Sequence, residues 1–187
     1  MKIFIAGAKS IKNIDDNIKQ KLLSIAKKNY DVLVGDCHGI DSAVQNYFNI
    51  LKYPKVTIYA SNGKARNNLG NWSIQNVPVE EGTVGFEFYR KKDVAMANEA
   101  DYGFMVWDGK SKGTLNNIIS LTNQNKVVLL YLIKHKKMLK IQTSEELSAL
   151  ISKCDKSTQA LFKKYNSIKD DYFQITLFDD ISSIEND

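Results

Sequence analysis

The stretch ADYGFMVWDGKSKGTLNNI, residues 100–118, decides the fold. Residues 102–107 form an apolar run short enough for a buried β-strand, a glycine-bearing turn follows over 108–113, and an amphipathic segment begins at Thr114. A strand, a turn and a helix start in this order place free backbone N–H groups and the positive end of a helix at the strand's carboxyl end. Open α/β sheets bind anionic ligands there. The stretch therefore predicts a nucleotide-binding pocket built around this turn.

The same turn superficially resembles a phosphate-binding P-loop, because Gly109, Lys110 and Ser111 match the end of that motif. The motif requires four residues between its first glycine and the Gly-Lys pair. Here five residues separate Gly103 from Gly109, and Gly103 lies within the apolar run. The spacing excludes a Walker-type NTPase.

Composition indicates an ordinary globular chain of one domain with an extension. The 187 residues are 43% apolar and 25% charged. No apolar run approaches the roughly 20 residues that a membrane-spanning helix needs, and Met1 and Lys2 lead directly into a strand pattern. The distant cysteines, Cys37 and Cys154, do not suggest a disulfide framework. We therefore expect a cytoplasmic protein with no membrane partner.

The net charge of +5 comes almost entirely from lysine. Only Arg66 and Arg90 are arginines, which makes them candidates for recognition of an anion through two hydrogen bonds, although chance placement explains them equally well. No long basic run with interleaved aromatic residues occurs, so the composition allows nucleic-acid binding without specifically supporting it.

Strand and helix patterns alternate along the first half of the chain. Buried-strand patterns cover 2–6, 31–35 and 55–60, and helical spacing covers 14–26 and 40–51, with Asn13 or Asp15 as the first cap. This alternation predicts a parallel sheet with right-handed crossovers. We expect an α/β fold, a Rossmann-like doubly wound sheet in three layers with a five-stranded core, whose turns after Ala6, Val34 and Trp107 converge on one pocket.

Residues 61–85 interrupt the alternation. Their length and their Asn- and Gly-rich composition predict a lid or binding loop that is mobile without ligand, a disordered insertion being the alternative. A helix is expected over 86–98, where Glu87, Arg90 and Lys91 share a face and form either a site or a surface ion pair.

A strand over 126–133 completes the expected nucleotide-binding domain, residues 1–133. Residues 134–187 are expected to form a C-terminal extension packed on the domain or on a partner subunit. Within it we expect an edge strand over 138–141, a helix to residue 151 capped by Thr143 and Glu146, and a last helix over 155–165.

The turns together resemble the SLOG superfamily, which includes the Lonely Guy phosphoribohydrolases and the DNA-processing protein A group, and above all its small bacterial and phage branch. The resemblance covers roughly residues 1–133. It is carried by three turns and by an Arg-Met-Ala-Asp segment: Gly7-Ala8-Lys9-Ser10; Gly35-Asp36-Cys37-His38-Gly39-Ile40-Asp41; Trp107-Asp108-Gly109-Lys110-Ser111-Lys112-Gly113-Thr114; and Arg90, Met96, Ala100 and Asp101. It implies a Rossmann-like nucleotide-binding protein that assembles as a homodimer or higher homo-oligomer.

Residues of these turns are the expected ligand-binding set. Glycines allow close backbone approach, Asp41 either caps a helix or reaches a ribose, Trp107 either stacks on a base or belongs to the core, and Asp108 either accepts from a ribose or stabilises its turn. The full set comprises Gly7, Ala8, Lys9, Ser10, Gly35, Asp36, His38, Gly39, Asp41, Arg90, Trp107, Asp108, Gly109, Ser111, Gly113, Thr114 and Asn117.

Asn117 separates two functions. The enzymes that the chain resembles carry a glutamate three residues after Gly-Thr, and that carboxylate serves as nucleophile or acid/base. An amide cannot ionise, so Asn117 favours binding without hydrolysis of a nucleotide-derived ligand such as an ADP-ribose-type signal. The alternative is an N-glycosidase or nucleoside (deoxy)ribosyltransferase in which Glu87 is catalytic. No cofactor is expected.

Two short motifs carry weaker hypotheses. Cys37 and His38 are adjacent, but no second pair has the spacing of metal ligands, so no metal is expected. Residues Gln174-Ile175-Thr176-Leu177-Phe178 resemble the peptide by which bacterial proteins dock on the DNA polymerase sliding clamp. A strand that packs on its own domain explains this peptide better.

Overall fold

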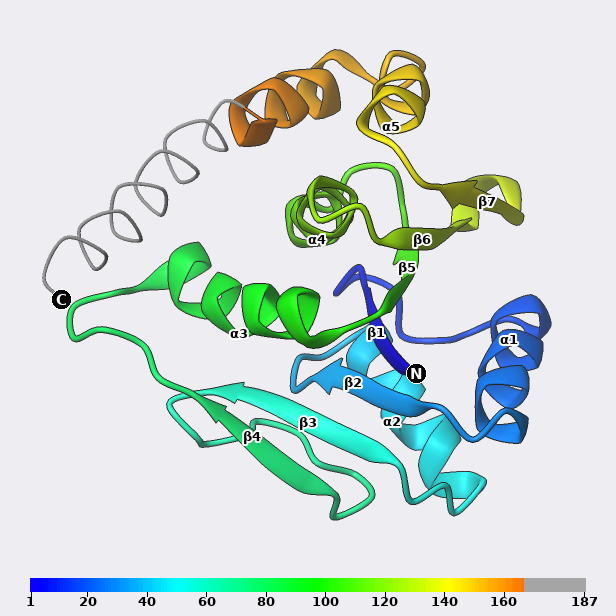
Figure 1. The fold of residues 1–187 in the computed structure, drawn as a ribbon, viewed down its shortest axis with the longest axis vertical. Helices are drawn as coiled ribbons and strands as arrows, with labels where there is room; N and C mark the ends of the chain where they lie inside the picture. Colours follow the sequence, from blue (N-terminus) through cyan, green and yellow to red (C-terminus); the bar gives the residue numbers. More distant parts are fainter. Residues whose placement is uncertain (167–187) are drawn as a thin grey trace, which may run out of the picture.

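The computed structural model describes residues 1–166 and contains a seven-stranded sheet in the order β4-β3-β2-β1-β5-β6-β7 (Figure 1). The first six strands in this order are parallel, and β7 runs antiparallel to β6. The strands are β1 (Lys2–Gly7), β2 (Asp31–Gly35), β3 (Val56–Ser61), β4 (Ser73–Val77), β5 (Tyr102–Trp107), β6 (Val127–Leu132) and β7 (Lys137–Ile141). The helices are α1 (Asp16–Lys27), α2 (Ile40–Ile50), α3 (Gly85–Glu99), α4 (Lys112–Asn123) and α5 (Ser144–Ile151).

The chain reverses its direction of travel across the sheet beside β1. From β1 it moves to β2, β3 and β4, and α3 then carries it back to β5 on the other side of β1. Ile5 consequently pairs with Val34 of β2 on one side and with Phe104 of β5 on the other. The gap between the carboxyl ends of β1 and β5 is the switch point where doubly wound sheets bind ligands.

The side chains of β1 alternate between two cores, one on each face of the sheet. Ile3 and Ile5 pack with Ile18 and Leu22 of α1 and with the apolar face of α2. Phe4, on the opposite face, packs with α3 and α4. Burying each of these large apolar side chains contributes about 1.5–3 kcal/mol before conformational entropy is counted. The predicted Rossmann-like α/β fold in three layers is confirmed.

The parallel part of the sheet has six strands and not the five predicted, while the expected edge strand over 138–141 is present as β7. Residues 61–85 do not form one long loop. Ser73–Val77 is β4, which pairs in parallel with β3, so the prediction of a connection without secondary structure is wrong. The strand was missed because it lies at the sheet edge and is mostly exposed, which removes the hydrophobic alternation that marks a strand. Trp72 anchors it, since the indole Nε1 donates to the carbonyl of Tyr53 at 2.9 Å.

The sheet and the core continue past the expected domain boundary at residue 133. β7 pairs with β6, and Ile141, Leu147 and Phe162 belong to the same core as α3 and α4. The predicted cap of α5 is present, because the Thr143 hydroxyl accepts from the Glu146 amide at 3.2 Å. The chain is again helical from residue 156 to the last described residue. The clamp-like peptide, residues 174–178, lies outside the described residues.

Within residues 1–166, no helix is both long enough and apolar enough to span a bilayer.

Candidate functional site

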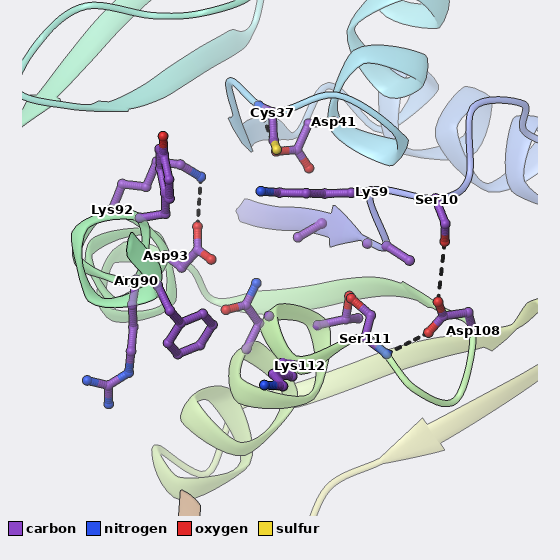
Figure 2. Close-up of a pocket in the computed structure, with 18 of the residues that line it drawn as sticks. Lys9, Ser10, Cys37, Asp41, Arg90, Lys92, Asp93, Asp108, Ser111 and Lys112 are labelled. Atoms are coloured by element: carbon purple, nitrogen blue, oxygen red, sulfur yellow. Dashed lines mark hydrogen bonds and ion pairs between the residues drawn. The ribbon is translucent and has the colours of Figure 1, made fainter. Parts of the chain in front are cut away.

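A cavity of about 560 Å³ lies at the carboxyl ends of β1 and β5, at the switch point of the sheet (Figure 2). Its volume falls within the range of small-molecule sites. Five segments line it: the end of β1 with the turn after it, the turn after β2, the connection after β3, the turn after β5 with the start of α4, and one face of α3. The lining residues are Ala6, Gly7, Ala8, Lys9, Ser10, Cys37, Asp41, Arg66, Gly85, Phe86, Tyr89, Arg90, Lys92, Asp93, Met96, Asp108, Lys110, Ser111, Lys112, Gly113, Thr114 and Asn117.

Glycines allow the turn after β1 to lie directly on its neighbours. A Cβ at Gly7 would stand 2.5 Å from the carbonyl oxygen of Val106 in β5. A Cβ at Gly39 would stand 2.5 Å from the carbonyl oxygen of Lys9, and the φ of Gly39 is +83°. Gly7 is therefore explained by its close approach to β5, and Gly39 by contact between the second turn and the first. From this turn Lys9 extends across the cavity toward α3 (Figure 2).

Asp108 fixes the turn after β5. Its Oδ1 accepts from the amides of Lys110 at 2.9 Å and Ser111 at 2.7 Å, and its Oδ2 accepts from the Ser10 hydroxyl at 3.3 Å (Figure 2). Of the two roles predicted for this residue, the structure shows stabilisation of the turn, and the same carboxylate joins the first turn to the third.

The amino end of α4 faces the cavity. The helix begins at Lys112, two residues earlier than expected, and no side chain caps it at Ser111. The first amide bonded within the helix is that of Leu115, which donates to the carbonyl of Ser111 at 3.1 Å. The preceding first-turn N–H groups, together with the helix dipole, favour an anion at this end of the cavity.

Asn117 supplies a buried polar atom without a partner. The residue is 3% exposed, lines the cavity, and its Oδ1 accepts no hydrogen bond. Among residues 1–166, Asn117 Oδ1 is the one buried side-chain polar atom without a hydrogen-bond partner. An unpaired buried acceptor costs about 1–3 kcal/mol, so a ligand whose donor group turns this amide oxygen toward the cavity would recover free energy here.

A cluster of interacting charged side chains forms one side of the cavity. Asp36 accepts two hydrogen bonds from the guanidinium of Arg66 and a third from its backbone amide. Lys92 forms an ion pair with Asp93 at 2.8 Å and a longer one with Asp36 at 3.9 Å. A Cβ at Gly35 would stand 2.5 Å from Asp41 Oδ2 and 2.6 Å from Lys92 Nζ, so this glycine makes room for the cluster. The surrounding carboxylates raise the pKa of Lys92 against the opposing effect of burial.

Asp41 is the most perturbed carboxyl group of the cluster. Burial raises its pKa to about 6, although the Lys92 charge and the hydrogen bond from the Cys37 amide at 3.2 Å oppose the shift. By contrast, the hydrogen bonds from Arg66 outweigh burial at Asp36 and lower its pKa. Asp41 therefore exchanges its proton near neutral pH while Asp36 stays ionised.

Asp41 makes stability depend on pH in a predictable direction. Its folded pKa exceeds its unfolded value of 3.8, so its stabilising contribution is complete below pH 4 and is lost as the pH rises through 6. Between pH 5 and pH 7.5 we expect the wild type to lose about 1 kcal/mol of unfolding free energy relative to Asp41→Asn. Urea unfolding of both proteins at the two pH values measures this, and parallel pH profiles would contradict the assignment.

The wall formed by α3 carries exposed aromatic residues. Phe86 and Tyr89 are 38% and 37% exposed, and the guanidinium of Arg66 lies 4.2 Å from the centre of the Tyr89 ring. Lys9 Nζ lies 5.3 Å from the same ring. Arg90 is turned away from Lys9 toward Asn116 and Glu87 (Figure 2). The cavity thus offers flat aromatic surface beside positive charge.

The lining carries more positive than negative charge, with six basic and three acidic side chains. Three of the basic residues, Lys9, Lys110 and Lys112, come from the first and third turns. The arrangement suits an anionic ligand with a planar part. Among residues 1–166, no group of three or more His, Cys, Asp or Glu side chains could hold a metal ion.

Eleven of the residues expected to bind ligand lie together in this lining: Gly7, Ala8, Lys9, Ser10, Asp41, Arg90, Asp108, Ser111, Gly113, Thr114 and Asn117. Six others lie outside it: Gly35, Asp36, His38, Gly39, Trp107 and Gly109. Trp107 is a core residue with 1% exposure, and its indole donates to the Ser111 carbonyl, so stacking on a base is excluded in this arrangement. His38 is exposed, and Gly109 takes φ +83° and accepts from Thr158.

Glu87, the candidate catalytic residue, also lies outside the lining. Its side chain is 60% exposed and pairs with Arg90 at 3.3 Å, which matches the surface ion pair that was the simpler interpretation. The carboxylates that do line the cavity are Asp41, Asp93 and Asp108.

The α3 wall was largely missed by sequence reasoning. Phe86, Tyr89, Asp93 and Met96 line the cavity and recur at helical spacing, so one face of the predicted helix already carried the signal. Lys92 gave no such signal, because a lysine in a lysine-rich chain looks like a surface residue until its burial is seen.

Comparison with models of known protein families finds no match. No curated protein matches the sequence either. Among solved structures, the chain is similar to DNA processing protein A from Helicobacter pylori, described for its single-stranded DNA binding mode, with a TM-score of 0.54 and 13% identity over 91% of this chain and 81% of that one. The Helicobacter pylori protein belongs to the DNA-processing protein A group, which the three turns of the present chain resemble. At 13% identity the similarity shows a shared Rossmann-like fold.

Proposed function

We propose that the cavity between β1 and β5 binds a nucleotide or a nucleotide-derived ligand, such as an ADP-ribose-type signal, and does not hydrolyse it. The observation that carries the proposal is Asn117, a buried amide with an unpaired oxygen in the lining of a positively charged cavity. A sugar hydroxyl is the group that would complete its hydrogen bonding, and an amide in this place supplies no nucleophile.

The rest of the lining supports the same ligand class. The amino end of α4 with Lys9 and Lys112 suits a phosphate group, and the exposed rings of Phe86 and Tyr89 suit a base. The single-stranded DNA binding described for the structural neighbour is also recognition of a nucleotide-type partner. Assembly as a homo-oligomer remains a prediction from the resemblance.

N-glycosidic bond cleavage is the second candidate, and a specific observation favours it. Asp41 lines the cavity, and its pKa of about 6 suits proton transfer near neutral pH. In this alternative Asp41, and not the exposed Glu87, would assist departure of the base.

Incubation with nucleoside monophosphates, NAD and ADP-ribose separates the two functions. Native mass spectrometry of the purified protein reports a bound ligand, and chromatography reports free base. We expect a bound nucleotide and no release of base. Release of base that disappears in Asp41→Asn and persists in Glu87→Gln would overturn the binding-only proposal.

A further inference from the structure

A second, smaller cavity lies beside the first along the carboxyl edge of the sheet. Its volume is about 240 Å³, and it lies next to the ends of β2 and β3, whereas the first lies over β1 and β5. It is lined by Asp36, Ser61, Asn62, Lys64, Arg66, Phe88 and Tyr89. The nucleotide proposed above would occupy only the first cavity.

Arg66 and Tyr89 line both cavities and therefore form the wall between them. The guanidinium stacks on the ring at 4.2 Å. It is held there by Asp36, which accepts from Nε at 3.0 Å and from Nη2 at 2.7 Å. Because Asp36 is buried and its pKa is lowered, this anchor stays charged at neutral pH. The wall is a fixed cation–aromatic pair.

Such a wall suits a particular kind of ligand. Nucleobases stack on aromatic rings and on guanidinium planes, and basic side chains placed between stacking surfaces follow a phosphate backbone. The bonds to Asp36 occupy Nε and Nη2 of Arg66, which leaves Nη1 for a phosphate oxygen. Lys9 on one side and Lys64 on the other add positive charge.

We propose that the site takes two nucleoside units joined through phosphate, one unit in each cavity, with Arg66 and Tyr89 between them. This inference rests on the proposed function, because it places its first unit in the cavity between β1 and β5. Two nucleoside units joined through phosphate occur both in pyrophosphate-linked dinucleotides and in single-stranded nucleic acid.

Calorimetric titration with AMP, the dinucleotide pApA and NAD tests the proposal. We expect at least one of the linked ligands to bind roughly tenfold or more tightly than AMP, since a second base gains a stacking surface. If only pApA binds more tightly than AMP, the ligand is a single nucleic-acid strand. If only NAD binds more tightly than AMP, the ligand is a pyrophosphate-linked dinucleotide.

Variants of the wall and of the second cavity sharpen the test. Lys64→Ala should reduce the gain several-fold and leave AMP binding unchanged, because Lys64 lines the second cavity and not the first. Tyr89→Leu should remove most of the gain. Lys91→Ala is the matched control, because Lys91 shares α3 with Tyr89 but lines neither cavity.

The outcomes distinguish this inference from the function on which it rests. AMP binding without any gain for pApA or NAD overturns the second subsite alone, and so does a gain that survives both Lys64→Ala and Tyr89→Leu. Failure of all three ligands to bind overturns the proposed function and the subsite with it.

Discussion

Replacement of Lys92 by methionine is expected to lower the free energy of unfolding by about 3–5 kcal/mol at pH 7.5. The Lys92 side chain is 5% exposed and pairs with Asp93 and Asp36, while Asp41 lies in the same cluster. Methionine fills a similar volume but leaves these carboxylates with the partly exposed guanidinium of Arg66 as the remaining cation in contact with them. Urea unfolding of the purified variant measures the effect.

Lys91→Met is the matched control for this change. Lys91 precedes Lys92 on α3, but 40% of its side chain is exposed and it pairs at 3.3 Å with Glu80, which is 82% exposed, so its loss should cost less than about 1 kcal/mol. The loss caused by Lys92→Met should also shrink at pH 4.5, because Asp41, with a pKa of about 6, is then largely protonated. Equal effects of the two variants, or an equal loss at both pH values, would show that Lys92 does not neutralise the cluster.

Removal of the Lys9 charge is expected to weaken nucleotide binding by about 1.5–3 kcal/mol, the range for hydrogen bonds to charged groups. Lys9 crosses the cavity from the first turn, and its ammonium lies 5.3 Å from the centre of the Tyr89 ring. Calorimetric titration of Lys9→Ala with the ligand identified for the wild type measures the loss.

Lys12→Ala provides the comparison for Lys9→Ala, since Lys12 is exposed, lies three residues further along the chain and does not line the cavity. We expect its affinity to match that of the wild type. Similar losses in the two variants would indicate a general effect of net charge and not a contact made by Lys9.

The sequence predicted the layers and the switch point because both depend on local patterns. The apolar run of β5 is followed by a glycine turn and a helix, and this order alone places the turn at the carboxyl edge of the sheet. The alternation of Ile3, Phe4 and Ile5 between two faces follows from the geometry of any strand. Which helices cover each face could not be predicted, since a strand buried on both faces reads as one continuous apolar run.

The predictions that failed depend on packing between distant segments. β4 is mostly exposed and is held in place by pairing with β3 and by the hydrogen bond of Trp72 to Tyr53. Neither contact produces a periodic pattern in the sequence of β4. Trp107 ends its strand in a position that suits either stacking or burial, and only the packing of α4 decides between them. The pairing of Asp36 with Arg66 joins residues thirty positions apart, so neither sequence motif reveals it.

The proposed function is tested most directly at Asn117. Leucine has a similar shape and no polar atoms, and the Oδ1 that it would remove has no partner in the fold. We therefore expect Asn117→Leu to unfold at a urea concentration equal to or above that of the wild type. In the same preparation, calorimetry should show that nucleotide binding is at least about tenfold weaker. A variant that keeps the wild-type affinity would contradict the assignment of this cavity as the nucleotide site.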